Sequence, residues 1–399
     1  MFHAASNDEI KRGRTTDVYF ERVKRILEAK GLSKRIAVAE VTAGDFPDGW
    51  PWAVLCGIEE AAKLLEGLPV NVYSFPEGTI FRCMDRNGVR VPVLVVEGPY
   101  GDYCVYETPL LGFLCQASGI ATKAARIRKL AGGSLLVSFG IRRMHPAIAP
   151  MIDRAAYIGG FDAVSCLVGA KLIGEKPVGT MPHALIILLG DVASAIKAFD
   201  EVIEEEVPRI ALVDTFYDEK VEALKAAETL KGKLYGVRLD TPSSRRGDMT
   251  EIVREVKWEL KLRGYEHVKV IVSGGLDENE ISRLIEAGVD GFGVGTCLSN
   301  APTVNFALDI VEVEGKPIAK RGRLSGRKKV WRCMECMVDI VSPYRVEKAP
   351  KCPECGREME ELLKPLIIDG RLKSKLPAPK EIRRYVLSQL GKVSLQHNL

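Results

Sequence analysis

The strongest constraint on the fold is a regular alternation of short apolar runs and helical patterns between residues 135 and 295. Parallel strands joined by helices produce this pattern, because each strand is covered on both faces and reads as a continuous apolar run. Seven runs in succession favour a complete or partial barrel, and no Gly-x-Gly-x-x-Gly follows the first run, as a dinucleotide-binding fold would require. The predicted strands are 135–138, 163–166, 177–179, 210–214, 234–239, 268–272 and 291–295, and the predicted helices are 147–158, 184–205, 218–230, 248–262 and 277–287.

A different pattern precedes this alternation. Apolar runs follow one another there with only turn residues or a short helix between them, which predicts a mostly antiparallel sheet with helices packed on it. The predicted strands are 36–41, 70–75, 80–83 and 91–96, and the predicted helices begin at Thr15-Thr16-Asp17, at Cys56 and at Thr108-Pro109.

Four cysteines near the C-terminus form the most specific single motif, because Cys333-x-x-Cys336 is followed after fifteen residues by Cys352-x-x-Cys355. Two such turns can hold a metal ion tetrahedrally, and thiolates favour zinc. Four protein ligands leave no open position, so we expect a structural zinc site that stabilises a segment too small to fold alone. The alternatives are two disulfides or a nucleic-acid-binding knuckle that uses the basic turn 320–329.

These patterns predict an α/β protein with an N-terminal sandwich and a barrel. The expected divisions are an N-terminal α/β sandwich domain (1–110), a partial (β/α) TIM-like barrel with the functional site (111–300), a return to the first domain (301–330), and a small zinc-knuckle and C-terminal helical segment (331–399).

The composition argues against several classes of protein. A formal net charge of +4 is too small to indicate nucleic-acid binding, and no apolar run approaches the ~20 residues of a membrane span. The first fourteen residues lack the apolar segment of a signal peptide. Six further cysteines are scattered in apolar segments and read as reduced thiols, so we expect a cytoplasmic protein.

Polar residues stand at the ends of several predicted barrel strands, where barrel enzymes place their chemistry. Arg238 and Asp240 are two residues apart and point to one face of an apolar strand, which is costly unless they are paired or used. A single histidine at a strand end more often packs or caps a helix than takes part in catalysis, but polar residues stand at the strand ends on either side of His183. The candidates are Arg142, Arg143, Asp162, His183, Asp214, Arg238 and Asp240.

Small residues end the last two predicted strands, at Ser273-Gly274-Gly275 and at Gly293-Val294-Gly295-Thr296. Such ends let backbone N–H groups approach an anion, and barrels place phosphate sites at their late strands. The residues alone therefore predict a barrel enzyme for a phosphorylated sugar.

The order of these motifs resembles the type II phosphoribosyltransferases of NAD biosynthesis, and most closely the archaeal-type nicotinate phosphoribosyltransferase family. The resemblance spans roughly residues 10–330, and the terminal knuckle is similar to that of archaeal members. The matching motifs are Thr16-Asp17-Val18-Tyr19, Phe139-Gly140-Ile141-Arg142-Arg143, Gly179-Thr180-Met181-Pro182-His183, Val213-Asp214-Thr215, Arg238-Leu239-Asp240, Ser273-Gly274-Gly275 and Gly293-Val294-Gly295-Thr296.

The resemblance implies transfer of phosphoribosyl from phosphoribosyl pyrophosphate (PRPP) to nicotinate, giving nicotinate mononucleotide and pyrophosphate. It also implies Mg²⁺ bound with PRPP and ATP, and a homodimer or higher homo-oligomer with active sites shared between subunits. ATP would drive the reaction by phosphorylating His183. The breaking C1–O bond builds positive charge on the ribose, so catalysis would rest on positioning and on stabilising the departing diphosphate.

The resemblance also implies a role for each matching residue. Tyr19 would stack on the base, Phe139 and Arg142 would hold the nicotinate ring and carboxylate, and Asp162 would be an acid near the base. Arg238 and Asp240 would bind ribose and diphosphate. The remaining substrate-binding positions, those of phosphate among them, would be Thr180, Asp214, Ser273, Gly274, Gly275, Gly295 and Thr296.

The chain departs from the family pattern in two places, and three rival functions stay open. Asp240 is followed by Thr241-Pro242-Ser243-Ser244-Arg245-Arg246-Gly247-Asp248, where many relatives have Ser-Gly-Asp, and Pro182 precedes His183. Quinolinate phosphoribosyltransferase has the same fold class and no use for His183, but a substrate with two carboxylates should need more site arginines. The second rival is a nucleic-acid-binding protein, and the third is a barrel that binds a phosphosugar without catalysis.

Overall fold

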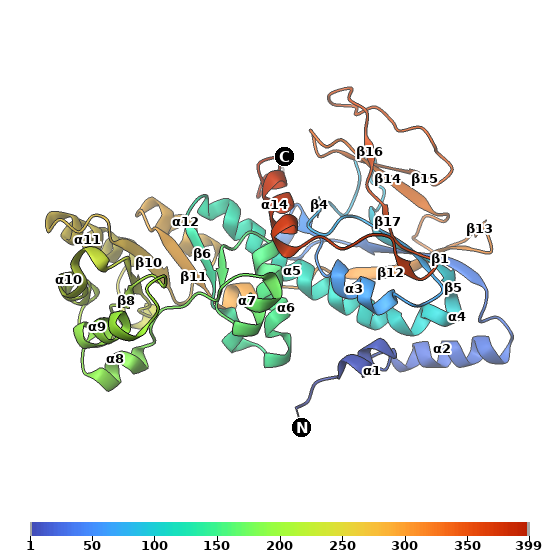
Figure 1. Cartoon of the computed structure of the whole chain (residues 1–399). Coiled ribbons are helices and arrows are strands. Elements are labelled where there is room, and N and C mark those ends of the chain that lie inside the picture. The colour runs from blue at the N-terminus through green and yellow to red at the C-terminus, as the bar shows by residue number, and fades with distance from the viewer. Residues whose placement is uncertain (1, 397–399) are drawn as a thin grey trace. The chain divides into compact units, whose positions relative to one another are not determined.

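The computed structural model describes residues 2–396 and divides into two compact units. One unit contains the chain up to Thr122 and from Pro302 onward, and the other contains residues 123–301 (Figure 1). The first division falls within the helix α5 (Glu107–Ala131). We predicted domain boundaries after residues 110 and 300, whereas the compact units divide after residues 122 and 301.

The unit 123–301 is built on a curled sheet of six parallel strands, a half-barrel (Figure 1). The spatial order of its strands is β7-β6-β11-β10-β9-β8. β6, the first of these strands along the chain, therefore pairs on one side with β7, the second, and on the other side with β11, the last. This order confirms the predicted partial barrel, whose open side lies between β7 and β8. The strands are β6 (Leu135–Ser138), β7 (Ala163–Val164), β8 (Ile210–Leu212), β9 (Gly236–Leu239), β10 (Lys269–Ser273) and β11 (Gly291–Val294).

The predicted strand at 177–179 was wrong. Residues 175–182 are irregular, and Val178 N–H donates a single hydrogen bond of 2.9 Å to the carbonyl of Val164. Pro177 has no N–H to contribute to a ladder, which explains why the apolar run does not form a strand. The barrel is therefore open where this segment passes, and the segment delivers His183 to the first turn of α8 (His183–Leu189).

The predicted helix at 184–205 is in fact two helices. α8 ends at Leu189 with Gly190 as its C-cap, and Asp191 then caps α9 (Val192–Val202) by accepting a 2.7 Å hydrogen bond from Ser194 N–H. The other helices of the unit are α6 (Ala149–Ile158), α7 (Leu167–Ile173), α10 (Glu219–Leu230), α11 (Met249–Leu262), α12 (Glu278–Glu286) and α13 (Thr296–Ser299).

The other unit contains a seven-stranded antiparallel sheet of order β13-β12-β1-β5-β3-β17-β18. Its apolar face packs with α3 (Ile58–Leu65) and the first half of α5 in one core that includes Val41, Leu65 and Leu114. The predicted antiparallel sheet with helices is confirmed. The strands are β1 (Ile36–Ala43), β3 (Asn71–Ser74), β5 (Pro92–Pro99), β12 (Phe306–Val313), β13 (Lys316–Pro317), β17 (Lys364–Ile368) and β18 (Arg371–Leu372), with β2 (Ala53–Val54) and β4 (Ile80–Phe81) paired separately and α1 (Asn7–Lys11), α2 (Val18–Ala29) and α4 (Tyr100–Tyr103) preceding α5.

A small three-stranded sheet carries the four cysteines of the C-terminal motif. It consists of β14 (Lys328–Arg332), β15 (Asp339–Pro343) and β16 (Glu360–Glu361), and α14 (Pro379–Leu390) follows. The four Sγ atoms lie within 4.8 Å of one another. Zn–S bonds of about 2.3 Å in a tetrahedron require sulfur atoms roughly 3.8 Å apart, so the donor set fits zinc.

Among the described residues, no helix combines the length and the apolar character needed to cross a membrane.

Candidate active site

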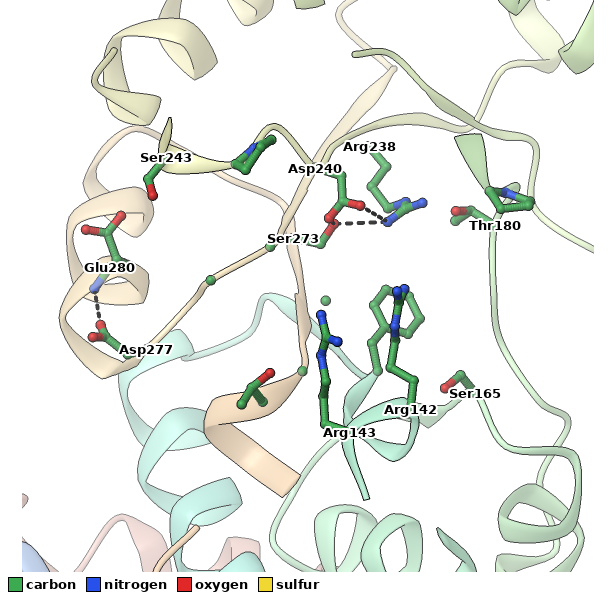
Figure 2. Close-up of a pocket in the computed structure, with 18 of the residues that line it drawn as sticks. Arg142, Arg143, Ser165, Thr180, Arg238, Asp240, Ser243, Ser273, Asp277 and Glu280 are labelled. Carbon is green, nitrogen blue, oxygen red and sulfur yellow. Dashed lines mark hydrogen bonds and ion pairs between the residues drawn. The ribbon is translucent and has the colours of Figure 1, made fainter. Parts of the chain in front are cut away.

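A cavity of about 1150 Å³ opens at the carboxyl ends of the half-barrel strands (Figure 2). Because parallel strands end at the same edge of a sheet, residues that are distant in sequence meet there. The structure brings most of the predicted site residues to this cavity. Those that line it are Phe139, Arg142, Thr180, Arg238, Asp240, Ser273, Gly274, Gly275, Gly295 and Thr296.

Arg238, Asp240 and Ser273 form a hydrogen-bonded group on one wall of the cavity (Figure 2). Arg238 Nη1 donates to Ser273 Oγ over 3.1 Å and lies 3.4 Å from Asp240 Oδ2. Ser273 Oγ donates in turn to Asp240 Oδ1 over 2.7 Å. The arginine predicted to be paired or used is therefore paired, and its charge and that of Asp240 are held in fixed positions.

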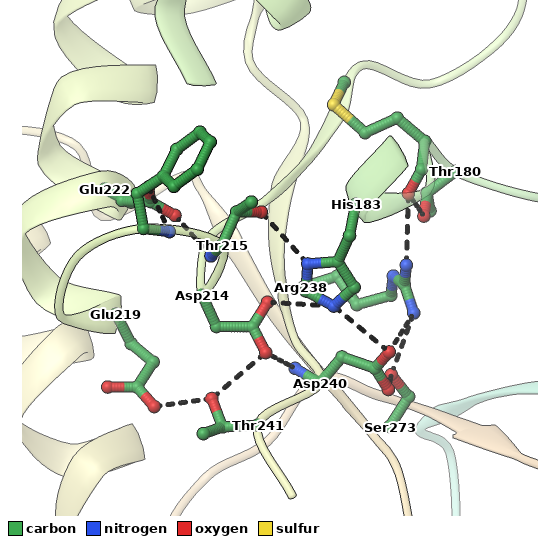
Figure 3. Close-up of polar contacts among 12 residues, drawn as sticks. Thr180, His183, Asp214, Thr215, Glu219, Glu222, Arg238, Asp240, Thr241 and Ser273 are labelled. Atoms are coloured by element: carbon green, nitrogen blue, oxygen red, sulfur yellow. Dashed lines mark hydrogen bonds and ion pairs between the residues drawn. The ribbon is translucent and has the colours of Figure 1, made fainter. Parts of the chain in front are cut away.

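His183 lies beside this group, between two carboxylates (Figure 3). Its Nε2 is 3.8 Å from Asp214 Oδ1 and 3.8 Å from Asp240 Oδ2, and its Nδ1 is 3.0 Å from Thr215 Oγ1. The His183 side chain is 40% exposed, whereas that of Asp214 is only 3% exposed. Burial raises the pKa of Asp214, and the neighbouring His183 opposes this rise. His183 thus belongs to a polar cluster rather than to an apolar core.

Two buried glutamates on α10 support this cluster, and the sequence analysis missed both. Glu222, 1% exposed, accepts hydrogen bonds from Thr215 N–H (2.9 Å) and Phe216 N–H (3.2 Å). Glu219 Oε1 lies 2.5 Å from Thr241 Oγ1, which also contacts Asp214 Oδ2. Acids in the first turn of a helix are common because they interact favourably with the helix dipole, and they ordinarily face solvent. Glu219 and Glu222 differ from such acids only in being buried, which the sequence does not show.

Arg142 and Arg143 reach the cavity from the side opposite Asp240 and Ser273 (Figure 2). Both follow Phe139 in a short 3₁₀ turn, and neither has a carboxylate partner among residues 2–396. The Phe139 ring packs onto Gly293, where a Cβ atom would lie 2.4 Å from a ring carbon. An aromatic face beside unpaired guanidinium groups suits a planar anion.

The glycine-rich turn after β10 presents backbone to the same cavity. Gly274 and Gly275 have φ angles of +85° and +68°, which side chains rarely adopt. Their left-handed conformation leaves the strand end open beside Asp240. Such a turn suits close approach of a phosphate to backbone N–H groups.

A further buried acid, Asp153, lies beside the end of β6, which leads into the Phe139 turn. Asp153 accepts hydrogen bonds from Ser138 Oγ (2.8 Å) and Cys166 N–H (3.1 Å), and it is fully buried. Burial raises the pKa of Asp153 to about 6, and these two hydrogen bonds lower it in part. Asp153 thereby ties together the ends of β6 and β7, from which Phe139 and Ser165 extend to the cavity.

Two predicted site residues lie elsewhere in the chain. Asp162 precedes β7 and so stands at the amino end of the strand, where it accepts from Leu136 N–H (2.9 Å) and pairs with Arg128. The structure does not bring Asp162 to the cavity. Tyr19 lies on α2 in the other unit and is 53% exposed.

Comparisons with family models and curated proteins give matches over most of the chain. Residues 17–118 match the family described as quinolinate phosphoribosyl transferase, N-terminal domain, and residues 120–309 match its C-terminal domain. A nicotinate phosphoribosyltransferase of Mycobacterium tuberculosis (pncB1) is 33% identical over 356 residues, covering 80% of this chain and 78% of that protein. The nicotinate phosphoribosyltransferase of Bacillus subtilis is 28% identical over 363 residues, covering 79% and 72%.

Solved structures agree with these matches. The crystal structure of a nicotinate-nucleotide pyrophosphorylase from Pyrococcus furiosus superposes with a TM-score of 0.94, is 59% identical and covers 98% of both chains. The human nicotinic acid phosphoribosyltransferase has a TM-score of 0.73 at 21% identity, covering 96% of this chain and 95% of that one. The human protein therefore shows the same fold.

Proposed function

Because this chain belongs to the phosphoribosyltransferases of NAD biosynthesis, we propose that it transfers phosphoribosyl from PRPP to nicotinate. The products are nicotinate mononucleotide and pyrophosphate. The observation that carries this proposal is the position of His183, whose Nε2 lies 3.8 Å from Asp214 and 3.8 Å from Asp240, a residue that lines the cavity. The names of the curated relatives support nicotinate as the acceptor.

Nicotinate binds between Phe139 and the arginines of the same turn. The aromatic ring supports the planar pyridine, and the unpaired Arg142 guanidinium pairs with the carboxylate. The pyridine nitrogen already has a lone pair, so the transfer needs no general base. Tyr19, exposed on the other unit, contributes to the base site of a second copy in a homodimer.

PRPP occupies the opposite wall. The Arg238–Ser273–Asp240 group holds the ribose, and the turns at Gly274-Gly275 and Gly295-Thr296 bind phosphate, with Thr180 at the same cavity. Positive charge that develops on C1 is stabilised by the Asp240 carboxylate. Mg²⁺ bound with the phosphates would take carboxylate oxygens such as those of Asp240 and would neutralise the departing diphosphate.

His183 accepts a phosphoryl group from ATP. Donation from Nδ1–H to Thr215 Oγ1 over 3.0 Å leaves the lone pair on Nε2. This nitrogen, beside the cavity-lining Asp240, attacks the γ-phosphorus as ADP departs. Phosphorylation places negative charge beside Asp214 and Asp240. Its hydrolysis after transfer releases that charge and couples ATP consumption to mononucleotide formation.

The four-cysteine cluster completes the proposal as a structural zinc site in a cytoplasmic enzyme. Cys333, Cys336, Cys352 and Cys355 supply four thiolates within 4.8 Å of one another, and the scattered remaining cysteines fit a reducing compartment.

Quinolinate phosphoribosyltransferase is the second candidate. The 59% identical structure from Pyrococcus furiosus carries the name nicotinate-nucleotide pyrophosphorylase, and the matched family description names quinolinate. The cavity also contains Arg246 and Arg283, which the sequence did not identify. Arg283, however, is paired with Asp248, and an ATP-independent enzyme has no use for the His183 cluster.

The deciding experiment measures mononucleotide formation from PRPP with nicotinate or quinolinate, with and without ATP. We expect turnover of nicotinate that rises with ATP, and an acid-labile phosphohistidine that disappears in His183→Ala. His267→Ala, an exposed histidine that does not line the cavity, is the matched control. Release of CO₂ from quinolinate, unaffected by ATP and by His183→Ala, would refute the proposal in favour of the second candidate.

A further inference from the structure

The loop that joins β9 to α11, residues 241–248, is anchored at both ends. At its start, Thr241 Oγ1 lies 3.1 Å from Asp214 Oδ2 and 2.5 Å from Glu219 Oε1. At its end, Asp248 accepts a 2.9 Å hydrogen bond from Thr250 N–H and pairs with Arg283 at 2.8 Å. A loop held in this way can present a side chain in a defined position.

That side chain is Arg246, which lines the cavity and is half-buried. Its Nε donates to the carbonyl of Thr241 over 3.0 Å and its Nη1 to the carbonyl of Gly247 over 3.2 Å. These two bonds orient the guanidinium group. The adjacent Arg245 is exposed and does not line the cavity.

The positive charge of Arg246 has no carboxylate partner within 4.0 Å among the described residues. The nearby Asp248 is engaged by Arg283, and Asp240 is engaged by Arg238. A partly desolvated charge without a counter-charge is unfavourable, unless a ligand supplies the counter-charge. Asp248 acts on Arg246 electrostatically from beyond that distance, but its direct partner is Arg283. The loop therefore places an oriented cation without a direct ion-pair partner among the described residues in the wall of the cavity.

We propose that Arg246 binds the diphosphate of the phosphoribosyl donor and stabilises it as the leaving group. This inference rests on the proposed function, since it requires PRPP as the substrate. The other anionic groups already have sites: Arg142 faces the carboxylate of the base, and the Gly274-Gly275 turn suits the 5′-phosphate. The resemblance gives the diphosphate to Arg238 and Asp240, but the charge of Arg238 is already paired with Asp240. Arg246 follows Asp240 by six residues and lines the same cavity, so it can supply the charge that the diphosphate requires.

The chemistry of the guanidinium group fits this role. Its planar fork donates two parallel hydrogen bonds to phosphate oxygens, and its charge is permanent. As the bond from C1 to oxygen breaks, both of its electrons move to the diphosphate, and a fixed cation there lowers the barrier. The ring nitrogen of the base then forms the new bond to C1.

The test measures binding of two probes to the full-length protein by calorimetry in the presence of Mg²⁺. Inorganic pyrophosphate reports the diphosphate site, and nicotinate mononucleotide, which has only the 5′-phosphate, reports the rest of the cavity. Arg246→Ala should weaken pyrophosphate binding about tenfold or more and leave mononucleotide binding within about twofold. Arg246→Lys should retain part of the pyrophosphate affinity, because a point charge replaces the fork.

Controls separate a binding role from a structural one. Arg245→Ala removes the neighbouring charge outside the cavity and should leave the affinity for both probes unchanged. Arg246→Gln retains an N–H donor near the position of Nε for the Thr241 carbonyl, so it should lose pyrophosphate affinity even if Arg246→Ala disorders the loop. Thermal unfolding of each variant identifies any loss of structure.

The outcomes are distinct. Equal weakening of both probes in Arg246→Gln would place Arg246 at the 5′-phosphate and overturn the inference. Unchanged pyrophosphate affinity in Arg246→Ala, with normal binding by the wild type, would overturn this inference alone. A wild-type protein that binds neither probe nor PRPP would overturn the proposed function together with it.

Discussion

Glu222 offers a direct test of how the fold positions His183. Its buried carboxylate accepts the N–H groups of Thr215 and Phe216 at 2.9 and 3.2 Å, and the Thr215 hydroxyl lies 3.0 Å from His183 Nδ1. In Glu222→Gln one carboxylate oxygen becomes an NH₂ group. One backbone N–H then faces a donor instead of an acceptor, and the remaining bond loses its charge assistance.

The magnitude follows from these two bonds. A hydrogen bond to a charged acceptor contributes about 1.5–3 kcal/mol, a neutral one about 1 kcal/mol, and a buried unsatisfied donor costs about 1–3 kcal/mol. Glu222→Gln should therefore lower the free energy of unfolding by roughly 2–4 kcal/mol. For a unit of this size each kcal/mol corresponds to roughly 2–4 °C in Tm, so we expect a fall of about 5–15 °C.

The functional consequence separates Glu222 from an ordinary buried acid. If the turn at 215–216 shifts, His183 loses its Thr215 contact, and stimulation by ATP should fall about tenfold, while binding of mononucleotide changes little. Thr215→Val should reduce stimulation by ATP to a similar extent. The double variant should lose as much stimulation as Glu222→Gln alone, rather than the product of the two single losses. Phosphohistidine content and Tm are the assays.

Glu228→Gln, an exposed acid on the same helix, is the matched control and should change Tm by less than about 2 °C. A Tm for Glu222→Gln equal to that of this control would refute the burial argument. A lower Tm with unchanged ATP stimulation would refute the positioning of His183 through Thr215.

Three further predictions concern the cavity wall, the buried acid and the cysteine cluster. Gly293→Ala places a Cβ 2.4 Å from the Phe139 ring, so the KM for the pyridine substrate should rise about tenfold while the KM for PRPP stays unchanged. Gly133→Ala, which has open space around it, is the control. An unchanged KM for the pyridine substrate in Gly293→Ala would contradict this role of the Phe139 ring. Because burial raises the pKa of Asp153 from 3.8 to about 6, its protonation stabilises the folded chain below pH 4 and this contribution is lost as the pH rises through about 6. As the pH rises from 4 to 7, the free energy of unfolding of the wild type, measured with denaturant, should therefore fall relative to that of Asp153→Asn. A difference between the two proteins that stays constant over this range would exclude the titration of Asp153. Cys352→Ser should remove about one equivalent of zinc measured by mass spectrometry and lower Tm, whereas Cys83→Ser, outside the cluster, should retain the metal. Full zinc content in Cys352→Ser would disprove the four-thiolate site.

Local patterns in the sequence were sufficient for the main architecture. Apolar runs alternating with helical periodicity predicted the half-barrel, because burial on both faces imposes that pattern residue by residue. The same reasoning failed at 177–179, where Pro177 interrupts the ladder, and at 190–191, where one predicted helix is two. In both places a short apolar run was compatible with more than one local structure.

Strand ends in the sequence also predicted most of the cavity. Phe139, Arg142, Arg238 and the glycine turns follow their strands and line it. Asp162 does not, because it directly precedes β7 and so lies at the amino end of a parallel strand, whereas the cavity lies at the carboxyl ends.

By itself, the sequence determined which residue types stand at which strand ends, and hence the class of chemistry, because strand and helix periodicities are local properties of the chain. Only the tertiary structure decided that His183 lies between Asp214 and Asp240, that Glu222 holds the turn beside it, and that Arg246 lines the cavity without a direct ion-pair partner among the described residues. These relations depend on distances between loops far apart in sequence. The curl of the sheet sets those distances, and no local pattern encodes them.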